Sequence, residues 1–485
     1  MLGIRGKPIV NLNWSGFLVC SYRKLTLFPH RALITSAVMR TSCLFYVAES
    51  RARLPQLRLM GLVMLPHSIT DKRGRVLVFG DDMRIFLTVV RSLGRAGHEV
   101  HAVPFNWLSS ALKSRYVTAI HRIPRYSDGA EEWCRAVEKL LDQNVFDLII
   151  PCCDDRSILP FHIHRERFAR HRIALPPGEA MNSLFDKADT RRLAIELQIP
   201  VVSGRVVSEA DTAQSLVAEF GLPVVIKPRR SFWIDKLDLW GKVWIAESSQ
   251  EAEVALRNVS DRSRYVVEAF FDGEGIGVSV LADDGQIKHA FQHRRLREGR
   301  GGCSSFRISE RLDPDLLGAC RKFTERTRHT GVCMFEFRKN PLNSKWILIE
   351  TNARFWGSSP LPVALGVNFP AFLYDLLVER RNHTAIDYRI GVRSRNVVLD
   401  ARNLIANLAA NGIGNRARAL RDIADFCLMP LHLMTGRERS DSIVLDDPMP
   451  AVQEILDIVK NIRNNRFRQN QNELNRRATD RIAAS

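Results

Sequence analysis

The sequence lacks most features of disulfide-rich, zinc-binding and membrane-spanning proteins. Its nine cysteines are an odd number without a CxxC pair, and Cys152 and Cys153 are adjacent, which argues against a disulfide framework or a zinc site. No apolar run reaches the length that a membrane helix needs. The GxGxxG fingerprint of dinucleotide-binding folds is also missing. These absences favour a cytoplasmic protein with free thiols and no membrane partner.

Charge is present, but it is unbalanced. The 485 residues include 71 Lys and Arg against 53 Asp and Glu, a net charge of +18. Such an excess suits nucleic acid, anionic membranes or phosphate-rich ligands. The basic residues are spread along the chain, with local excesses at both ends, and no nucleic-acid motif with interleaved aromatics occurs. We therefore expect no specific nucleic-acid partner. Because 45% of the residues are hydrophobic and 26% are charged, the composition is typical of a globular enzyme.

Residues 1–70 differ in composition from the rest of the chain. No acidic residue precedes Glu49, and arginines, hydroxyl residues and apolar residues follow no lasting period. The composition is that of a transit peptide, but the length and the missing amphipathic pattern fit poorly. A start of translation at Met60 or Met64 explains the region equally well. We expect a poorly ordered or spurious extension here, and a frayed basic tail over 464–485.

Residues 71–180 are predicted to form an open, largely parallel α/β sheet, because strands at 75–79, 98–103 and 146–150 alternate with helices. Asp154 and Asp155 come after the last of these strands, at the edge where such sheets bind ligands. They either cap the next helix or contact substrate.

Residues 181–380 are predicted to begin with a helical linker over 181–200 and to end in helices over 360–380. The predicted strands between them are 201–202, 222–227, 243–246, 265–271, 278–281 and 287–292. A basic run at 293–298 then leads into a glycine-rich loop. Lys227, which ends an apolar strand, either reaches up to water or contacts phosphate. Residues 381–485 are basic and are predicted to form a helical extension.

The segment 331–357 is predicted to form two antiparallel strands joined by a turn at 339–344. Alternation places Glu336 on one face of the first strand. The second strand should show one face that carries Trp346, Leu348, Glu350 and Asn352.

Three oxygen-bearing side chains converge if the two strands pair with Glu336 opposite Glu350, the third being Asn352. A carboxylate in an apolar strand is costly unless something neutralises it. Mg²⁺ is a natural partner, since it binds one or two carboxylates together with substrate phosphates. Arg354 could then meet phosphate. Alternatively, Glu336 pairs with a nearby arginine, and the other two residues lie at a strand end.

Five segments in this order resemble the ATP-grasp superfamily. They are FDKADTRRLA, PVVIKP, YVVEAFFDG, FQHRRLRE and MFEFRK…WILIETNARFWGS. From about Arg75 to Arg380 the chain is most similar to predicted carboxylate–amine ligases related to the ATP-binding half of carbamoyl-phosphate synthetase. The resemblance implies an α/β N-terminal open-sheet (pre-ATP-grasp) domain over 71–180. It also implies a two-subdomain α+β ATP-grasp fold over 181–380, and then a helical C-terminal extension.

The resemblance also implies roles for individual residues. Lys187 and Lys227 would contact the ATP phosphates. Four residues would form the hinge beside adenine: Glu268, Ala269, Phe270 and Phe271. Glu274 takes the ribose contact only as a guess, because the family's glutamate position is Gly275 here. One or two Mg²⁺ ions, or Mn²⁺, would be held by Glu336, Glu350 and Asn352. The transferring phosphoryl group would be stabilised by Arg354, Arg294 and Arg295. Arg229–Trp233 and Gly241 replace the usual Gly/Ser-rich phosphate loop.

The implied activity is ATP-dependent formation of an acyl-phosphate from a carboxylate, and then attack by an amine. The substrates would be small molecules that the sequence does not identify, and homo-oligomerisation stays open. Two alternatives are an ATP-grasp phosphotransferase without acyl transfer and a basic nucleic-acid-binding module on a degenerate nucleotide fold.

Overall fold

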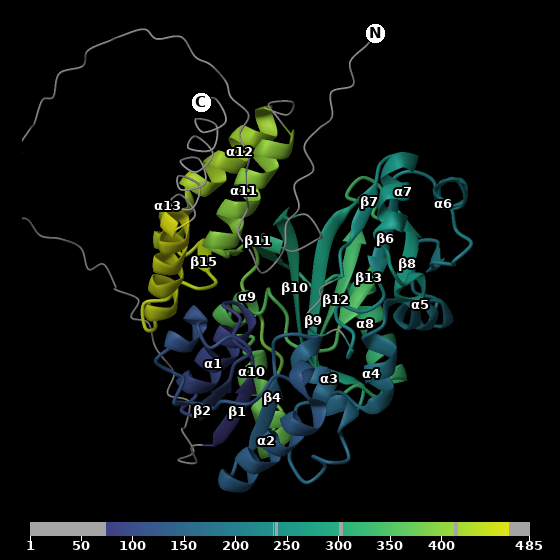
Figure 1. Cartoon of the computed structure of the whole chain (residues 1–485). Coiled ribbons are helices and arrows are strands. Elements are labelled where there is room, and N and C mark those ends of the chain that lie inside the picture. The colour runs from purple at the N-terminus through teal and green to yellow at the C-terminus, as the bar shows by residue number, and fades with distance from the viewer. Residues whose placement is uncertain (1–73, 236, 238–240, 300–303, 412–415, 465–485) are drawn as a thin grey trace, which may run out of the picture. The chain divides into compact units, whose positions relative to one another are not determined.

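The computed structural model describes residues 74–464, apart from 236, 238–240, 300–303 and 412–415 (Figure 1). The chain divides into a unit of residues 1–69 and a unit of residues 70–485, and the described residues all belong to the second unit. The expectations for 1–70 and for the tail beyond 464 lie outside the described residues. Within the described part, no helix combines the length and apolarity that crossing a membrane requires.

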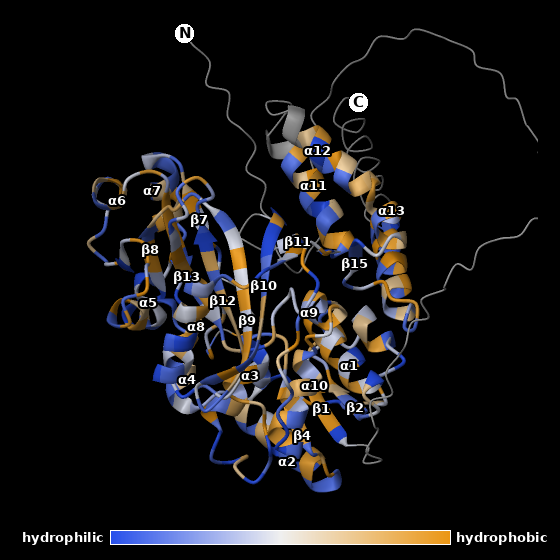
Figure 2. Ribbon diagram, turned by 180° about the vertical axis from the view of Figure 1, so that it is seen from behind, coloured by the Kyte–Doolittle hydropathy of each residue, from blue (hydrophilic) through white to orange (hydrophobic). Residues whose placement is uncertain are grey.

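The first part of this unit is the predicted parallel sheet, with strand order β3-β2-β1-β4. Its strands are β1 Arg75–Phe79, β2 Glu99–Val103, β3 Ala119–Ile120 and β4 Leu148–Pro151. Its main helices are α1 Ile85–Arg95, α2 Ala130–Gln143 and α3 Asp155–Ile163. The sequence RVLVF of β1 is an unbroken apolar run after its first residue, as expected for a strand covered on both faces. Figure 2 shows the hydrophobic colour along β1 and β4.

A second, smaller sheet has the order β5-β8-β6-β7. Its strands are β5 Gly204–Val206, β6 Val224–Pro228, β7 Trp244–Ala246 and β8 Tyr265–Ala269, and its helices are α6 Ala213–Phe220 and α7 Ser249–Arg257. The strand predicted at 201–202 is wrong, since β5 begins at Gly204, three residues after the predicted start. The strand predicted to reach 271 ends at Ala269. Residues 270–273 therefore form the connection from the small sheet to the large one.

The large sheet has seven strands in the order β13-β12-β9-β10-β11-β14-β15. They are β9 Glu274–Asp283, β10 Gln286–Glu298, β11 Ser304–Glu310, β12 Gly331–Lys339, β13 Trp346–Asn352, β14 Arg393–Arg395 and β15 Glu438–Ser440. The basic run at 293–298 is thus the second half of a long strand, which extends past the predicted strand over 287–292. Its arginines pair with acidic side chains of neighbouring elements, which the alternation pattern alone does not reveal.

Helices cover both faces of the large sheet. One face packs against α4 Gly178–Leu184, α5 Lys187–Glu196 and α8 Pro314–Arg326. The other face packs, through α9 Pro360–Ala364 and α10 Phe369–Tyr374, against the apolar residues of β1 and α1. The predicted linker over 181–200 is two helices, because Asp186 lies between them and caps the second by accepting from the backbone of Ala188.

The C-terminal extension is only partly helical, which corrects the prediction. It forms α11 Val397–Asn411, α12 Arg416–Cys427, α13 Met429–Met434 and a helix over 449–464. It also supplies β14 and β15 to the large sheet. Buried Arg395 of β14 pairs with Glu438 of β15 at 2.7 Å and with Asp400 of α11 at 2.6 Å. Strands of three residues show no period in the sequence, so the backbone pairings and the ion pair between Arg395 and Glu438 are needed to identify them.

Candidate functional site

The hairpin of β12 and β13 brings two carboxylates face to face. Its register pairs Glu336 with Glu350, as predicted, and it pairs Met334 with Asn352. Glu336 and Met334 share a face of β12, so Asn352 lies on the side of the carboxylates. The Asn352 amide Nδ2 donates a hydrogen bond to Glu336 Oε1 at 3.1 Å. The three predicted oxygen-bearing side chains therefore converge.

A β-bulge beside this pair corrects the predicted faces of β13. Glu336 pairs with Glu350 but Phe337 pairs with Leu348, so Ile349 is the extra residue. Leu348 consequently points into the apolar cluster that also contains Phe337, away from Glu350. Simple alternation placed Leu348 with Glu350, and that was wrong because a bulge shifts the side-chain period by one.

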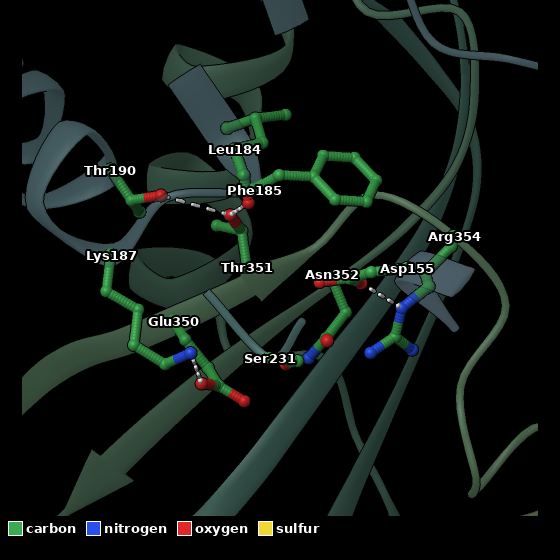
Figure 3. Close-up of a pocket in the computed structure, with 10 residues that line it drawn as sticks. All are labelled: Asp155, Leu184, Phe185, Lys187, Thr190, Ser231, Glu350, Thr351, Asn352 and Arg354. Atoms are coloured by element: carbon green, nitrogen blue, oxygen red, sulfur yellow. Dashed lines mark hydrogen bonds and ion pairs between the residues drawn. The ribbon is translucent and has the colours of Figure 1, made fainter. Parts of the chain in front are cut away.

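Glu350 is held ionised by two lysines. Lys187, the first residue of α5, places its Nζ 3.1 Å from Glu350 Oε2 (Figure 3). Burial alone would raise the pKa of Glu350. The charges of Lys187 and then Lys227, together with the Lys187 hydrogen bond, outweigh burial and lower this pKa to about 2.

The pKa of Glu336 shifts in the opposite direction, upward. Burial raises its pKa, the positive charge of Arg295 opposes the rise, and the nearby negative charge of Glu350 adds to it. Arg295 Nη2 donates to Glu336 Oε2 in an ion pair. The sequence left two alternatives for Glu336, pairing with an arginine or convergence with Glu350. The structure shows both.

Lys227 ends the apolar part of β6 in the small sheet and lies against the large one. Its Nζ is 2.7 Å from Glu268 Oε2 of β8, and it donates to the Ile349 carbonyl oxygen at 3.5 Å. The side chain is buried, so the expectation that it reaches up to water is wrong. The bulged carbonyl of Ile349 is thus one of the groups that this lysine meets across the two sheets.

Arg354, two residues beyond β13, contacts the first residue of helix α3. Its Nε donates to Asp155 Oδ1 at 3.3 Å, and its Nη1 donates to the Phe355 carbonyl oxygen at 3.0 Å. Asp154 is the cap of α3, because its side chain accepts from the backbone of Arg156. Of the two alternatives for this aspartate pair, capping holds for Asp154, while Asp155 lies at the site. Burial raises the pKa of Asp155, and Arg354 opposes that rise.

The pocket in Figure 3 collects part of this set, and Glu336, Arg295 and Lys227 are not among the residues that line it. It is lined by Asp155, Leu184, Phe185, Lys187, Thr190, Ser231, Glu350, Thr351, Asn352 and Arg354. The loop after β6 is tied to it by Asp186, which accepts from Arg229 Nε at 3.0 Å and from Arg230 Nε at 3.1 Å. Sequence reasoning missed Asp186, although its place just before a helix-forming segment is a capping signal.

Two residues predicted for the site, Arg294 and Glu274, lie outside the cluster around Glu336 and Glu350. Arg294 pairs with Ile276, which belongs to the apolar cluster on the face opposite Glu336. The Arg294 guanidinium bonds to Glu274 at 3.1 Å and to Glu310 at 2.6 Å. The cluster around Glu336 and Glu350 is therefore built without Arg294 and Glu274. The predicted hinge residues Ala269, Phe270 and Phe271 lie at and just after the end of β8, and the side chain of Phe270 is exposed.

The donor set suits Mg²⁺. Glu336 and Glu350 are close enough for the charge of one to raise the pKa of the other, and Asn352 adds an amide oxygen. Oxygen donors in this combination are those that Mg²⁺ takes when substrate phosphates complete its coordination. The neighbouring Lys187 and Arg295 now offset the two negative charges. The residues present therefore fit the cation that the resemblance implies.

Comparison with solved structures identifies the fold. The biotin carboxylase domain of 2-oxoglutarate carboxylase from Hydrogenobacter thermophilus, solved with MgADP, ADP and bicarbonate, matches with a TM-score of 0.52 at 16% identity, over 66% of this chain and 73% of that one. The ADP complex of N5-carboxyaminoimidazole ribonucleotide synthetase matches with a TM-score of 0.53 at 12% identity, over 69% and 86%. Biotin carboxylase from Campylobacter jejuni matches with a TM-score of 0.50 at 18% identity, over 66% and 74%.

No family model matches the sequence. A search of curated proteins likewise finds no match. The structural matches show that the chain has the ATP-grasp fold, which confirms the resemblance seen in the five sequence segments. At these identities the likeness establishes architecture, and activity has to be argued from the side chains themselves.

Proposed function

We propose that this chain is an ATP- and Mg²⁺-dependent ligase that activates a carboxylate as an acyl-phosphate and joins it to an amine. One observation carries the proposal. Lys187 of α5 and Lys227 of the small sheet lie beside Glu350, which is paired with Glu336 on the large sheet. Cations beside a pair of carboxylates suit the phosphates of a nucleotide and a divalent ion.

The side chains divide into nucleotide-binding and metal-binding groups. Lys187 and Lys227 are the point charges that would bind the ATP phosphates. Residues 268–271 would border the adenine, since they lie at the end of β8 and the start of the connection between the two sheets. Glu336, Glu350 and Asn352 would hold Mg²⁺, which when bound neutralises charge on the phosphoryl oxygens.

The reaction needs no nucleophile from the protein. An oxygen of the substrate carboxylate attacks the γ-phosphorus, the bond to the β-phosphate oxygen breaks, and ADP leaves. The amine nitrogen then attacks the acyl carbon, phosphate leaves with the bonding electrons, and the nitrogen loses its proton. Arg354 and Arg295 would stabilise negative charge on the transferred group. Their present carboxylate partners, Asp155 and Glu336, hold them at the site.

The proposal is tested by ADP release from Mg-ATP against pools of carboxylates and amines, with product analysis. Wild type should release ADP only when both substrates are present. Glu350→Gln should lower the rate roughly 100-fold, because charge stabilisation at the transferred group is lost. Glu179→Gln is the matched control, since this exposed carboxylate pairs with Arg326 at the surface. Wild-type turnover by Glu350→Gln would refute the metal assignment, and ADP release without amide formation would favour a phosphotransferase.

Binding is measured separately from turnover. Mg-ATP should raise the melting temperature of the wild type, and Lys227→Met should reduce this shift because a phosphate contact is lost. A shift with DNA or RNA alone, unchanged in Lys227→Met, would instead indicate a nucleic-acid-binding module.

A further inference from the structure

Arg295 reaches the carboxylate pair from a strand that is not next to it. It belongs to β10, whereas Glu336 belongs to β12, and β9 lies between these two strands (Figure 1). The side chain crosses β9 at Gly275, where an added Cβ atom would lie 2.7 Å from Arg295 Cδ. A side chain at this position would push the arginine aside. The glycine thus lets Arg295 pair with Glu336 across a strand.

Arg295 has a second carboxylate partner, Glu298, outside that pair. Arg295 Nη1 donates to Glu298 Oε1 at 3.1 Å. The two residues are three positions apart, but the register of β10 against β11 shifts between them, which brings both to one face. Glu298 Oε2 accepts in turn from Arg338 Nη2 at 2.7 Å, and Arg338 Nη1 donates to the Gly273 carbonyl oxygen at 3.1 Å. These bonds hold Glu298 in place independently of Glu336.

The two partners of Arg295 differ in what else they can bind. Glu336 faces a second carboxylate, Glu350, whereas Glu298 lies between two arginines. A divalent cation therefore binds at Glu336 in preference to Glu298, because two carboxylates meet there. Arg295 is repelled by a cation bound at Glu336, and Glu298 remains as its partner.

We propose that Arg295 exchanges Glu336 for Glu298 when the carboxylate pair binds Mg²⁺, and that only then does its guanidinium bind the anionic group of the substrate. Glu298 is the positioning residue for this exchange, because it keeps the released arginine over the site. The inference rests on the proposed function, since it takes Glu336 as a ligand of Mg²⁺. It adds an order of events, in which metal and nucleotide bind before the substrate anion.

A titration with Mn²⁺ in the absence of nucleotide, followed by electron paramagnetic resonance, tests the exchange. Arg295→Met should bind Mn²⁺ roughly tenfold more tightly than the wild type, because a positive charge beside the cation is removed. Glu298→Gln should bind Mn²⁺ about threefold more weakly, because Arg295 loses the carboxylate that receives it. If the two residues merely supported the fold, both variants would bind Mn²⁺ more weakly, and the proposal would be overturned.

Arg294→Met and Glu274→Gln are the matched controls, since they remove the same charges from an ion pair on the opposite face of the sheet. Both should bind Mn²⁺ within about twofold of the wild type, because the charges that they remove are distant from the cation and screened.

Glu350→Gln separates this inference from the proposed function. If Glu350→Gln loses Mn²⁺ binding while Arg295→Met binds no more tightly than the wild type, the metal site stands and the exchange is refuted. If Glu350→Gln binds Mn²⁺ as the wild type does, the metal assignment and the exchange are both refuted.

Calorimetric titration of the full-length variants with inorganic phosphate tests the order of events. With saturating MgADP, Arg295→Met should bind phosphate about fivefold more weakly than Arg294→Met, because the released guanidinium is a phosphate contact. With neither Mg²⁺ nor ADP the two variants should bind phosphate equally, because Glu336 keeps Arg295 from the anion. Equal affinities under both conditions, or a difference that persists without Mg²⁺, would overturn the proposal.

Discussion

Replacing Lys187 with Met measures how strongly the site holds Glu350 ionised before any ligand binds. Nζ of Lys187 lies 3.1 Å from Oε2 of Glu350, and this lysine is the largest influence that lowers the pKa of the carboxyl. The pKa falls from an ordinary 4.5 to about 2. That difference corresponds to about 3 kcal/mol of stability. It is the net of burial, which raises the pKa, and of Lys187, Lys227 and Arg295, which lower it.

The assay is a double-mutant cycle of urea unfolding with wild type, Lys187→Met, Glu350→Gln and the double variant, without nucleotide or Mg²⁺. We expect a coupling free energy of about 2 kcal/mol at pH 7, because Lys187 is the largest of the influences that lower this pKa. The folded pKa of Glu350 is depressed, so the coupling should be complete above pH 4.5 and should shrink as the pH falls toward about 2.

Two results would refute this reasoning. A coupling free energy below about 0.5 kcal/mol at pH 7 would mean that the ion pair is no stronger than a surface pair. A coupling that persists unchanged at pH 2 would mean that it does not depend on the charge of Glu350.

The remaining predictions concern packing around the site and the extension. Asp447→Ala should lower the free energy of unfolding by about 3–5 kcal/mol, because Arg91 is left charged and buried; a urea titration that finds less than about 1 kcal/mol would contradict this. Gly277→Ala should cost about 1–3 kcal/mol, because the added methyl would lie 2.3 Å from Cε1 of buried His293. Calorimetry should show a smaller loss from Gly277→Ala in a His293→Ala background than in the wild type. Gly318→Ala should instead raise stability by about 0.5–1 kcal/mol, because Gly318 lies inside helix α8 and the added methyl meets nothing.

Local patterns were sufficient for much of the fold. The apolar run of β1 and the alternation in β12 identify strands because side-chain burial alone sets those patterns. The opposition of Glu336 and Glu350 could also be predicted, since a short turn leaves few registers for a hairpin. The lysines were found only through the resemblance to ATP-grasp proteins, because a single Lys at a strand or helix end has many explanations.

Features that depend on distant contacts were not predictable. The bulge at Ile349 depends on how β13 fits against β12, and no residue type marks it. The three-residue strand β14 is held in place by the pairing of Arg395 with buried Glu438, 43 residues along the chain. A pairing of this kind leaves no local period.

The sequence by itself determined which chemical groups this protein carries and on which strands they lie, because alternation and turns act over a few residues. Only the tertiary structure decided their partners. It placed Asp155 beside Arg354, and it turned Arg294 to the face of β10 opposite Glu336. The physical reason is that ion pairing and burial are settled by segments that meet across hundreds of residues.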